Sequence, residues 1–108
     1  MGITKTEEFT VKDNKIAAYA KALAHPARIA ILQVLLKSQS CICGDIVNEL
    51  PLSQSTVSQH LKELKEAGLI KGNIDGASVC YCIDEKAWRD AKTYLNNLFD
   101  SFKGNNCC

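Results

Sequence analysis

Residues 53–72, with the sequence SQSTVSQHLKELKEAGLIKG, decide the fold because they contain a helix whose two ends are both marked. Ser53 is a typical N-cap residue, and Gly68 is typical of the position just after a helix ends. The sequence therefore predicts a helix over residues 54–67. At 3.6 residues per turn, its apolar side chains gather on one side. They are Val57, Leu61 and Leu64.

The start and the opposite side of this helix carry short hydrogen-bonding groups and lysines. Such side chains reach base edges and phosphates in the major groove of DNA without filling it. The candidate DNA-contacting residues are Ser53, Gln54, Ser55, Thr56, Ser58, Gln59, His60, Lys62 and Lys65. The alternatives are a plain solvated face and, for His60, a histidine packed against the backbone.

The rest of the chain places this helix in a winged helix-turn-helix. Apolar spacing predicts further helices over residues 12–23, 26–36 and 44–50. Two β-rich runs, 69–74 and 77–83, flank Asp75-Gly76, a pair typical of hairpin turns, and a last helix begins near Asp84. The order α-α-α-α-β-β-α is the outline of an α+β, mainly α fold with two helices, a turn and a wing.

Length and charge indicate one domain over residues 1–108, with an N-terminal arm at 1–11 and a flexible tail at 104–108. The chain has 108 residues, a formal net charge of +1 and 46% hydrophobic residues. A chain this short buries a limited core, and its last helix has a wide apolar stripe, so we expect a homodimer. Without a membrane-length apolar run or a signal-like start, we expect a cytoplasmic protein.

Six cysteines occur as three close pairs, Cys41/Cys43, Cys80/Cys82 and Cys107/Cys108. In a chain with long cysteine-free helices, this pattern favours reduced thiols kept for ligand binding or redox sensing. Cys41 and Cys43 lie just ahead of, or within, the first turn of the helix predicted at 44–50. A helix N-terminus stabilises thiolates, and in an extended segment the two sulfurs can converge on a soft ion. The alternative is a pair of idle, buried thiols.

Cys80 and Cys82 alternate with bulky apolar residues on the second predicted strand of the wing, so they share one face of it. If the bulky residues pack on the core, both thiols face outward. Idle, redox-active and ligand roles all remain open for this pair.

Several stretches resemble the ArsR/SmtB family of metal-sensing winged-helix repressors: LAHPARIAILQVLL, CICGDI, LSQSTVSQHLKELKEAGLI and VCYCI. The resemblance covers residues 12–103. It implies a homodimer joined through the first and last helices, binding to a palindromic DNA operator, and release when an effector binds. No cofactor is then needed for DNA binding. No acid–base pair, glycine-rich phosphate loop or Cys-x-x-Cys motif points to an enzyme.

The resemblance also suggests the effector. Cys41 and Cys43 match the two thiolates of the family's Cys-Val-Cys-Asp-Leu box, whereas Ile46 stands where arsenic-responsive members often have a third cysteine. As(III) and Sb(III) favour three thiolates, so Cys107 or Cys108 is expected to supply the missing one. The alternatives are a repressor that senses oxidants or sulfur species, and one that responds to cadmium, lead or zinc.

Overall fold

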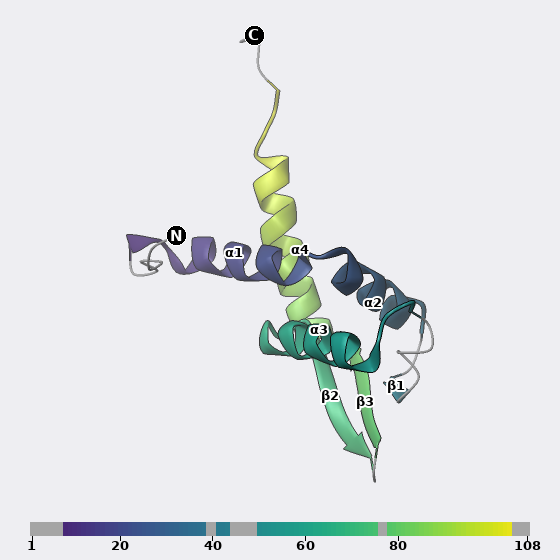
Figure 1. The fold of residues 1–108 in the computed structure, drawn as a ribbon. Coiled ribbons are helices and arrows are strands. Elements are labelled where there is room, and N and C mark those ends of the chain that lie inside the picture. The colour runs from purple at the N-terminus through teal and green to yellow at the C-terminus, as the bar shows by residue number, and fades with distance from the viewer. Residues whose placement is uncertain (1–7, 39–40, 44–49, 76–77, 105–108) are drawn as a thin grey trace.

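The computed structural model describes residues 8–38, 41–43, 50–75 and 78–104, and it has the expected winged helix-turn-helix outline (Figure 1). The elements are α1 (Val11–Leu23), α2 (Pro26–Lys37), β1 (Ile42–Cys43), α3 (Gln54–Glu66), β2 (Ile70–Asp75), β3 (Ser78–Ile83) and α4 (Glu85–Asp100). The helix at 54–67 is confirmed as α3. The helix predicted at 44–50 falls on residues 44–49, which lie outside the described residues.

Each helix begins where its sequence offers a capping group. The side chains of Thr10, His25, Ser53 and Asp84 accept hydrogen bonds from backbone N–H groups in the first turns of α1, α2, α3 and α4. Gly68 adopts a φ of 87° just after α3, a left-handed conformation that glycine takes readily. The chain therefore leaves α3 directly into the wing.

The sheet contains one strand that the sequence analysis missed. Its order is β1-β3-β2 with antiparallel pairing throughout, and β1 pairs Ile42 with Tyr81 and Cys43 with Cys80. Cys43 thus lies in a short edge strand and Cys41 directly precedes it, which is the extended arrangement that the sequence left open beside a place in the first turn of a helix. Asp75, which the sequence placed in the turn, still pairs with Ser78, so β2 extends one residue further than predicted; residues 76–77 lie outside the described residues.

The core lies where α3 meets α2 and the base of the wing. Its largest fully buried side chains are Ile31, Val57, Leu64, Leu69 and Ile70. α3 packs on α2 on one side and on β2 on the other, so the predicted apolar side of α3 is buried and its polar side faces outward. The position of α3 is therefore determined jointly by α2 and the wing.

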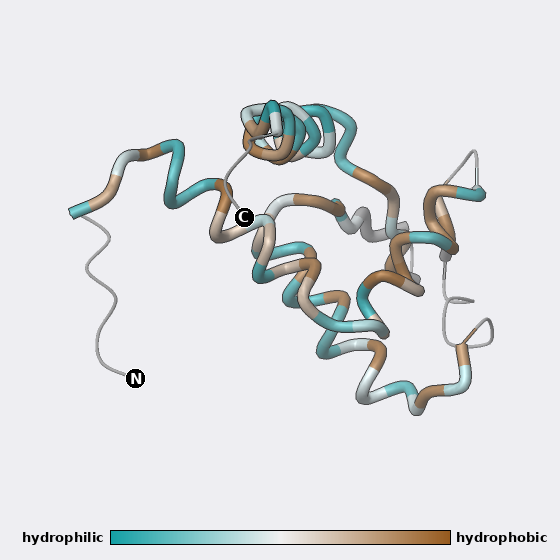
Figure 2. The backbone as a smooth tube through the Cα atoms, turned by 90° about the horizontal axis from the view of Figure 1, so that it is seen from above, coloured by the Kyte–Doolittle hydropathy of each residue, from teal (hydrophilic) through white to brown (hydrophobic). Residues whose placement is uncertain are grey.

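α4 extends away from this core (Figure 1), and the molecule measures 55 × 31 × 26 Å. Its radius of gyration of 16.4 Å exceeds the roughly 13 Å typical of a compact chain of this length. Figure 2 shows apolar residues at intervals along the helices. Large apolar side chains near the start of α1 and the end of α4 are exposed: Phe9, Val11, Leu98, Phe99 and Phe102. No helix in the described part is long and apolar enough to cross a bilayer.

Candidate DNA interface and thiol site

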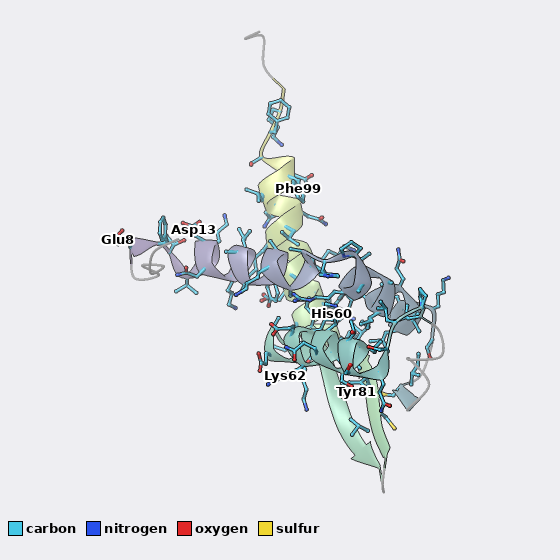
Figure 3. The ribbon with its side chains drawn as sticks, in the orientation of Figure 1. Glu8, Asp13, His60, Lys62, Tyr81 and Phe99 are labelled. Carbon is cyan, nitrogen blue, oxygen red and sulfur yellow. A yellow bond between two sulfur atoms is a disulfide. The ribbon has the colours of Figure 1, made fainter. Side chains whose placement is uncertain are left out.

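The outward side of α3 carries almost all of the residues predicted to contact DNA. Those with exposed side chains are Ser53, Gln54, Ser55, Thr56, Ser58, Gln59, Lys62 and Lys65. Lys62 points away from the body of the protein in Figure 3, on the side of α3 that is free of other elements. The structure therefore leaves all eight side chains accessible at the start and along the outer part of α3, and we call this set the α3 polar face.

Three hydroxyl groups gather at the start of α3. The Ser53 hydroxyl donates to Thr56 Oγ1 at 2.9 Å, lies 3.2 Å from Ser55 Oγ and accepts from the Thr56 backbone N–H at 3.3 Å. A helix N-terminus with exposed hydroxyls is suited to a DNA phosphate, because the backbone N–H groups and the helix dipole favour an anion. One turn further along, Gln59 Nε2 donates to Glu63 at 3.2 Å, so the free protein holds this amide on the helix surface.

His60 differs from the other predicted contacts because its ring is directed towards α2. Its Nδ1 accepts a hydrogen bond from Arg28 Nε at 3.2 Å, and its ring centroid lies 4.4 Å from that of His25. Burial lowers the pKa of His60 below its ordinary value, with smaller contributions in the same direction from His25 and Arg28. The neutral ring is therefore favoured, and it joins α3 to α2.

Arg28 was not singled out from the sequence, yet it connects three helices. Besides its bond to His60 on α3, its Nη1 donates to the carbonyl oxygens of Lys21 at 3.2 Å and Ala22 at 3.5 Å, at the end of α1. An arginine at the second position after His-Pro gives no local signal of this role. Only the packing of α1, α2 and α3 brings its partners together.

α1 and α4 are held together by a polar contact near the base of α4. The Tyr19 hydroxyl donates to Asp90 Oδ2 at 2.7 Å, and Lys15 Nζ lies 3.4 Å from the same oxygen. Burial and the adjacent carboxylate raise the pKa of Tyr19 to about 12, so it remains a hydrogen-bond donor at neutral pH. The contact fixes the angle between the two helices that carry the exposed apolar side chains.

The cysteines of β1 and β3 meet across the sheet. Cys41 and Cys82 form a disulfide with a Cα–Cα distance of 4.5 Å, as expected for residues directly opposite each other in an antiparallel pair. Two pairs further along, Cys43 lies opposite Cys80 in register, and Cys80 is also disulfide-bonded. The expectation of reduced thiols is therefore wrong for Cys41, Cys80 and Cys82 in this structure.

The face of β3 that carries the cysteines is also less open than expected. Tyr81 and Ile83 do pack against the core, but Cys80 on the opposite face is only 6% exposed and Cys82 is half-buried, whereas Cys41 is exposed. The side chain of Cys43, together with Cys107 and Cys108, lies outside the described residues. Within the part of the chain that is described, no three His, Cys, Asp or Glu side chains are grouped closely enough to bind a metal ion.

Known proteins share both the sequence and the fold. The profile of the family described as "Bacterial regulatory protein, arsR family" matches residues 25–71. The HTH-type transcriptional regulator YgaV of Escherichia coli is 30% identical over 97 residues, which cover 90% of this chain and 98% of YgaV. The chain belongs to the ArsR family.

Other members extend the comparison of this ArsR-family protein. The HTH-type transcriptional repressor SmtB of Mycobacterium tuberculosis is 48% identical over 61 residues, covering 56% of this chain and 44% of SmtB. A solved structure described as a possible transcriptional regulator for arsenical resistance superposes with a TM-score of 0.62 and 30% identity, covering 79% of this chain and 83% of that one. The resemblance to ArsR/SmtB regulators and the winged-helix fold are thereby confirmed, and the protein is a DNA-binding transcriptional regulator.

Proposed function

We propose that this ArsR-family protein is a cytoplasmic repressor that binds operator DNA as a homodimer and leaves it when As(III) or Sb(III) binds cysteine thiolates. The DNA-binding part rests on the α3 polar face, an exposed set of hydroxyl, amide and ammonium groups on a helix held between α2 and the wing. A solvated helix surface without such a role more often carries pairs of glutamate and lysine.

On this proposal the α3 polar face divides into two parts. The hydroxyls of Ser53, Ser55 and Thr56 at the start of the helix contact a DNA phosphate, and the lysines contact further phosphates. Ser58 and Gln59 are directed to base edges, for which a glutamine amide is a typical partner of adenine. His60 supports this surface from behind, through its hydrogen bond from Arg28.

The homodimer is supported by the apolar surface of α1 and α4. Leu98, Phe99 and Phe102 are 48%, 70% and 69% exposed, and Phe99 lies well away from the core in Figure 3. Next to them, an apolar groove of about 280 Å³ runs along α4, lined among others by Trp88 and Leu95. A monomeric protein rarely leaves so much contiguous apolar surface in water. A second copy, packed through the first and last helices, would cover it.

The effector site consists of Cys41 and Cys43 in their reduced form, completed by Cys107 or Cys108 of either subunit. Trivalent arsenic and antimony prefer soft thiolate ligands, and a reduced Cys41 is exposed at the edge of the sheet. The solved relative described as a possible regulator for arsenical resistance supports this choice of ion. Cadmium, lead and zinc are the competing ions.

The path from the thiols to the DNA is short. β1 pairs with β3, β3 pairs with β2, and β2 packs on α3. An ion that pulls on β1 therefore strains the surface that supports α3, and it binds the DNA-free form more tightly. To clear a saturated operator, this coupling must reach about 2–3 kcal/mol, a change of about 30- to 150-fold in affinity.

A repressor that leaves DNA on direct oxidation of its thiols is the second candidate, and the Cys41–Cys82 disulfide favours it. One titration separates the candidates. The reduced protein is bound to a duplex selected from random sequence, and arsenite, antimonite, cadmium, zinc or hydrogen peroxide is added. Our proposal expects release by arsenite and antimonite at the lowest concentrations. Release by peroxide alone would favour the second candidate.

A further inference from the structure

The wing cysteines have no part in the proposed effector site, yet one of them is bonded to a proposed ligand. Cys82 on β3 forms a disulfide with Cys41, and Cys80, also disulfide-bonded, lies in register opposite Cys43. Cys41 is thus bonded to one wing cysteine, and Cys43 is paired in register with the other. We call Cys41 and Cys82 the β1–β3 thiol pair.

We propose that the β1–β3 thiol pair is a reversible redox switch on effector binding: its oxidation by a hydroperoxide removes the Cys41 thiolate and leaves the repressor unable to bind trivalent metalloids. This inference rests on the proposed function for the identity of the effector. It differs from direct redox sensing because oxidation alone leaves the protein on the operator.

The chemistry needs only the two thiols and the oxidant. The Cys41 thiolate attacks one oxygen of hydrogen peroxide, the O–O bond breaks, and hydroxide leaves, giving a sulfenic acid. The Cys82 thiol then attacks that sulfur, forming the S–S bond, and its proton leaves with the sulfenic hydroxyl as water. The proton that Cys41 released on ionising neutralises the hydroxide of the first step. In total, two thiols and one peroxide give one disulfide and two waters. A dithiol reductant reverses the step by exchange.

The position of the pair suits this role. Cys41 is exposed directly before the edge strand β1, so an oxidant can reach it, whereas Cys82 is half-buried on β3, the strand that pairs with β1. The Cα–Cα distance of 4.5 Å belongs to ordinary antiparallel pairing, so the bond forms without rearrangement of the wing. The oxidised structure keeps α3 and its polar face in the winged-helix arrangement, which is why we expect operator binding to persist.

The test compares the wild type with C80S/C82S, which retains every proposed ligand and removes both wing thiols. V79S, a change at an exposed position of the same strand, is the matched control. Each protein is reduced, or oxidised with two equivalents of hydrogen peroxide, one for the disulfide of Cys82 and one for that of Cys80. Arsenite binding is measured by equilibrium dialysis, operator binding by titration of the selected duplex, and the Cys41–Cys82 link by peptide mapping before and after dithiothreitol.

We expect oxidation to weaken arsenite binding at least about tenfold in wild type and V79S, and less than about twofold in C80S/C82S, because only the former can bond Cys41 to the wing. Equal arsenite binding by the reduced and oxidised wild type, the same loss in C80S/C82S, or operator release by peroxide alone would each overturn the switch. If the reduced wild type binds arsenite but stays on DNA, the proposed function is refuted, whereas the redox control of arsenite binding still holds. No arsenite binding by the reduced protein would refute both.

Discussion

The Cys41–Cys82 disulfide should stabilise the DNA-reading unit by an amount that can be worked out from its place in the chain. It joins residues separated by 41 positions, and the loop that it closes contains α3 and β2. Closing a loop of this length in the unfolded chain reduces its entropy enough to contribute about 4 kcal/mol at 25 °C. Replacement of Cys82 should remove that contribution and leave the disulfide of Cys80 in place.

Urea unfolding followed by fluorescence of the single tryptophan, Trp88, measures this effect, because Trp88 packs against the core. With a slope of about 2 kcal/mol per molar urea, the urea midpoint of oxidised wild type should lie about 2 M above that of oxidised C82S at the same protein concentration. The urea midpoints of the two proteins should agree within about 0.3 M when both are reduced. A difference below about 0.5 M between the oxidised proteins would refute the reasoning, since the loop would then not constrain the unfolded chain.

Three further predictions concern the helices around the site. Gln59→Ala should weaken binding to the selected duplex by about 1–3 kcal/mol while changing binding to random DNA less than about twofold in a competition titration; equal losses would leave Gln59 only a structural role. Tyr19→Phe should lower the free energy of unfolding by about 1–2 kcal/mol, because Asp90 loses its hydroxyl donor, and an unchanged urea midpoint would contradict this. Because the folded protein lowers the pKa of His60, the unfolded chain takes up the proton first as the pH falls. The free energy of unfolding should therefore be highest above about pH 6.5 and fall as the pH drops below that value. His60→Gln should show a weaker fall over the same pH range.

The reading helix and its surroundings were predictable because their signals are local. Ser53 caps α3, Gly68 follows it, and the 3.6-residue period separates the buried Val57 from the exposed Gln59. A capping residue, a left-handed glycine and an amphipathic period each depend on neighbours within a few positions. The start predicted for the helix at 26–36 is likewise confirmed as the start of α2.

The thiol arrangement could not be predicted in the same way, since it depends on pairing between distant residues. β1 has only two residues, Ile42 and Cys43, which is too few to show the alternation of polar and apolar residues that indicates a strand. Its partner, β3, lies almost 40 positions later, and only the register reveals that Cys41 faces Cys82. The matching Cys-x-Cys spacing on both strands was the one available signal, because residues two apart share a face of a strand.

The contacts of His60 follow the same rule. Its place at the edge of the apolar side of α3 was visible in the sequence, but its partners Arg28 and His25 come from α2. The contacts between side chains of different helices depend on how those helices pack. The periodicity of one helix carries no information about the element that faces it. The choice between a base contact and a supporting role therefore required the three-dimensional arrangement.

The measurement that tests the account most directly is arsenite-driven release of the reduced protein from its selected duplex, compared between wild type and C41S/C43S. Both proteins should bind the duplex with affinities that agree within about twofold, because the α3 polar face is unchanged. Arsenite should then lower the affinity of the wild type by at least about 30-fold and leave that of C41S/C43S unchanged. Release of C41S/C43S at the same arsenite concentration would contradict the claim that thiols on β1 control the DNA-reading surface.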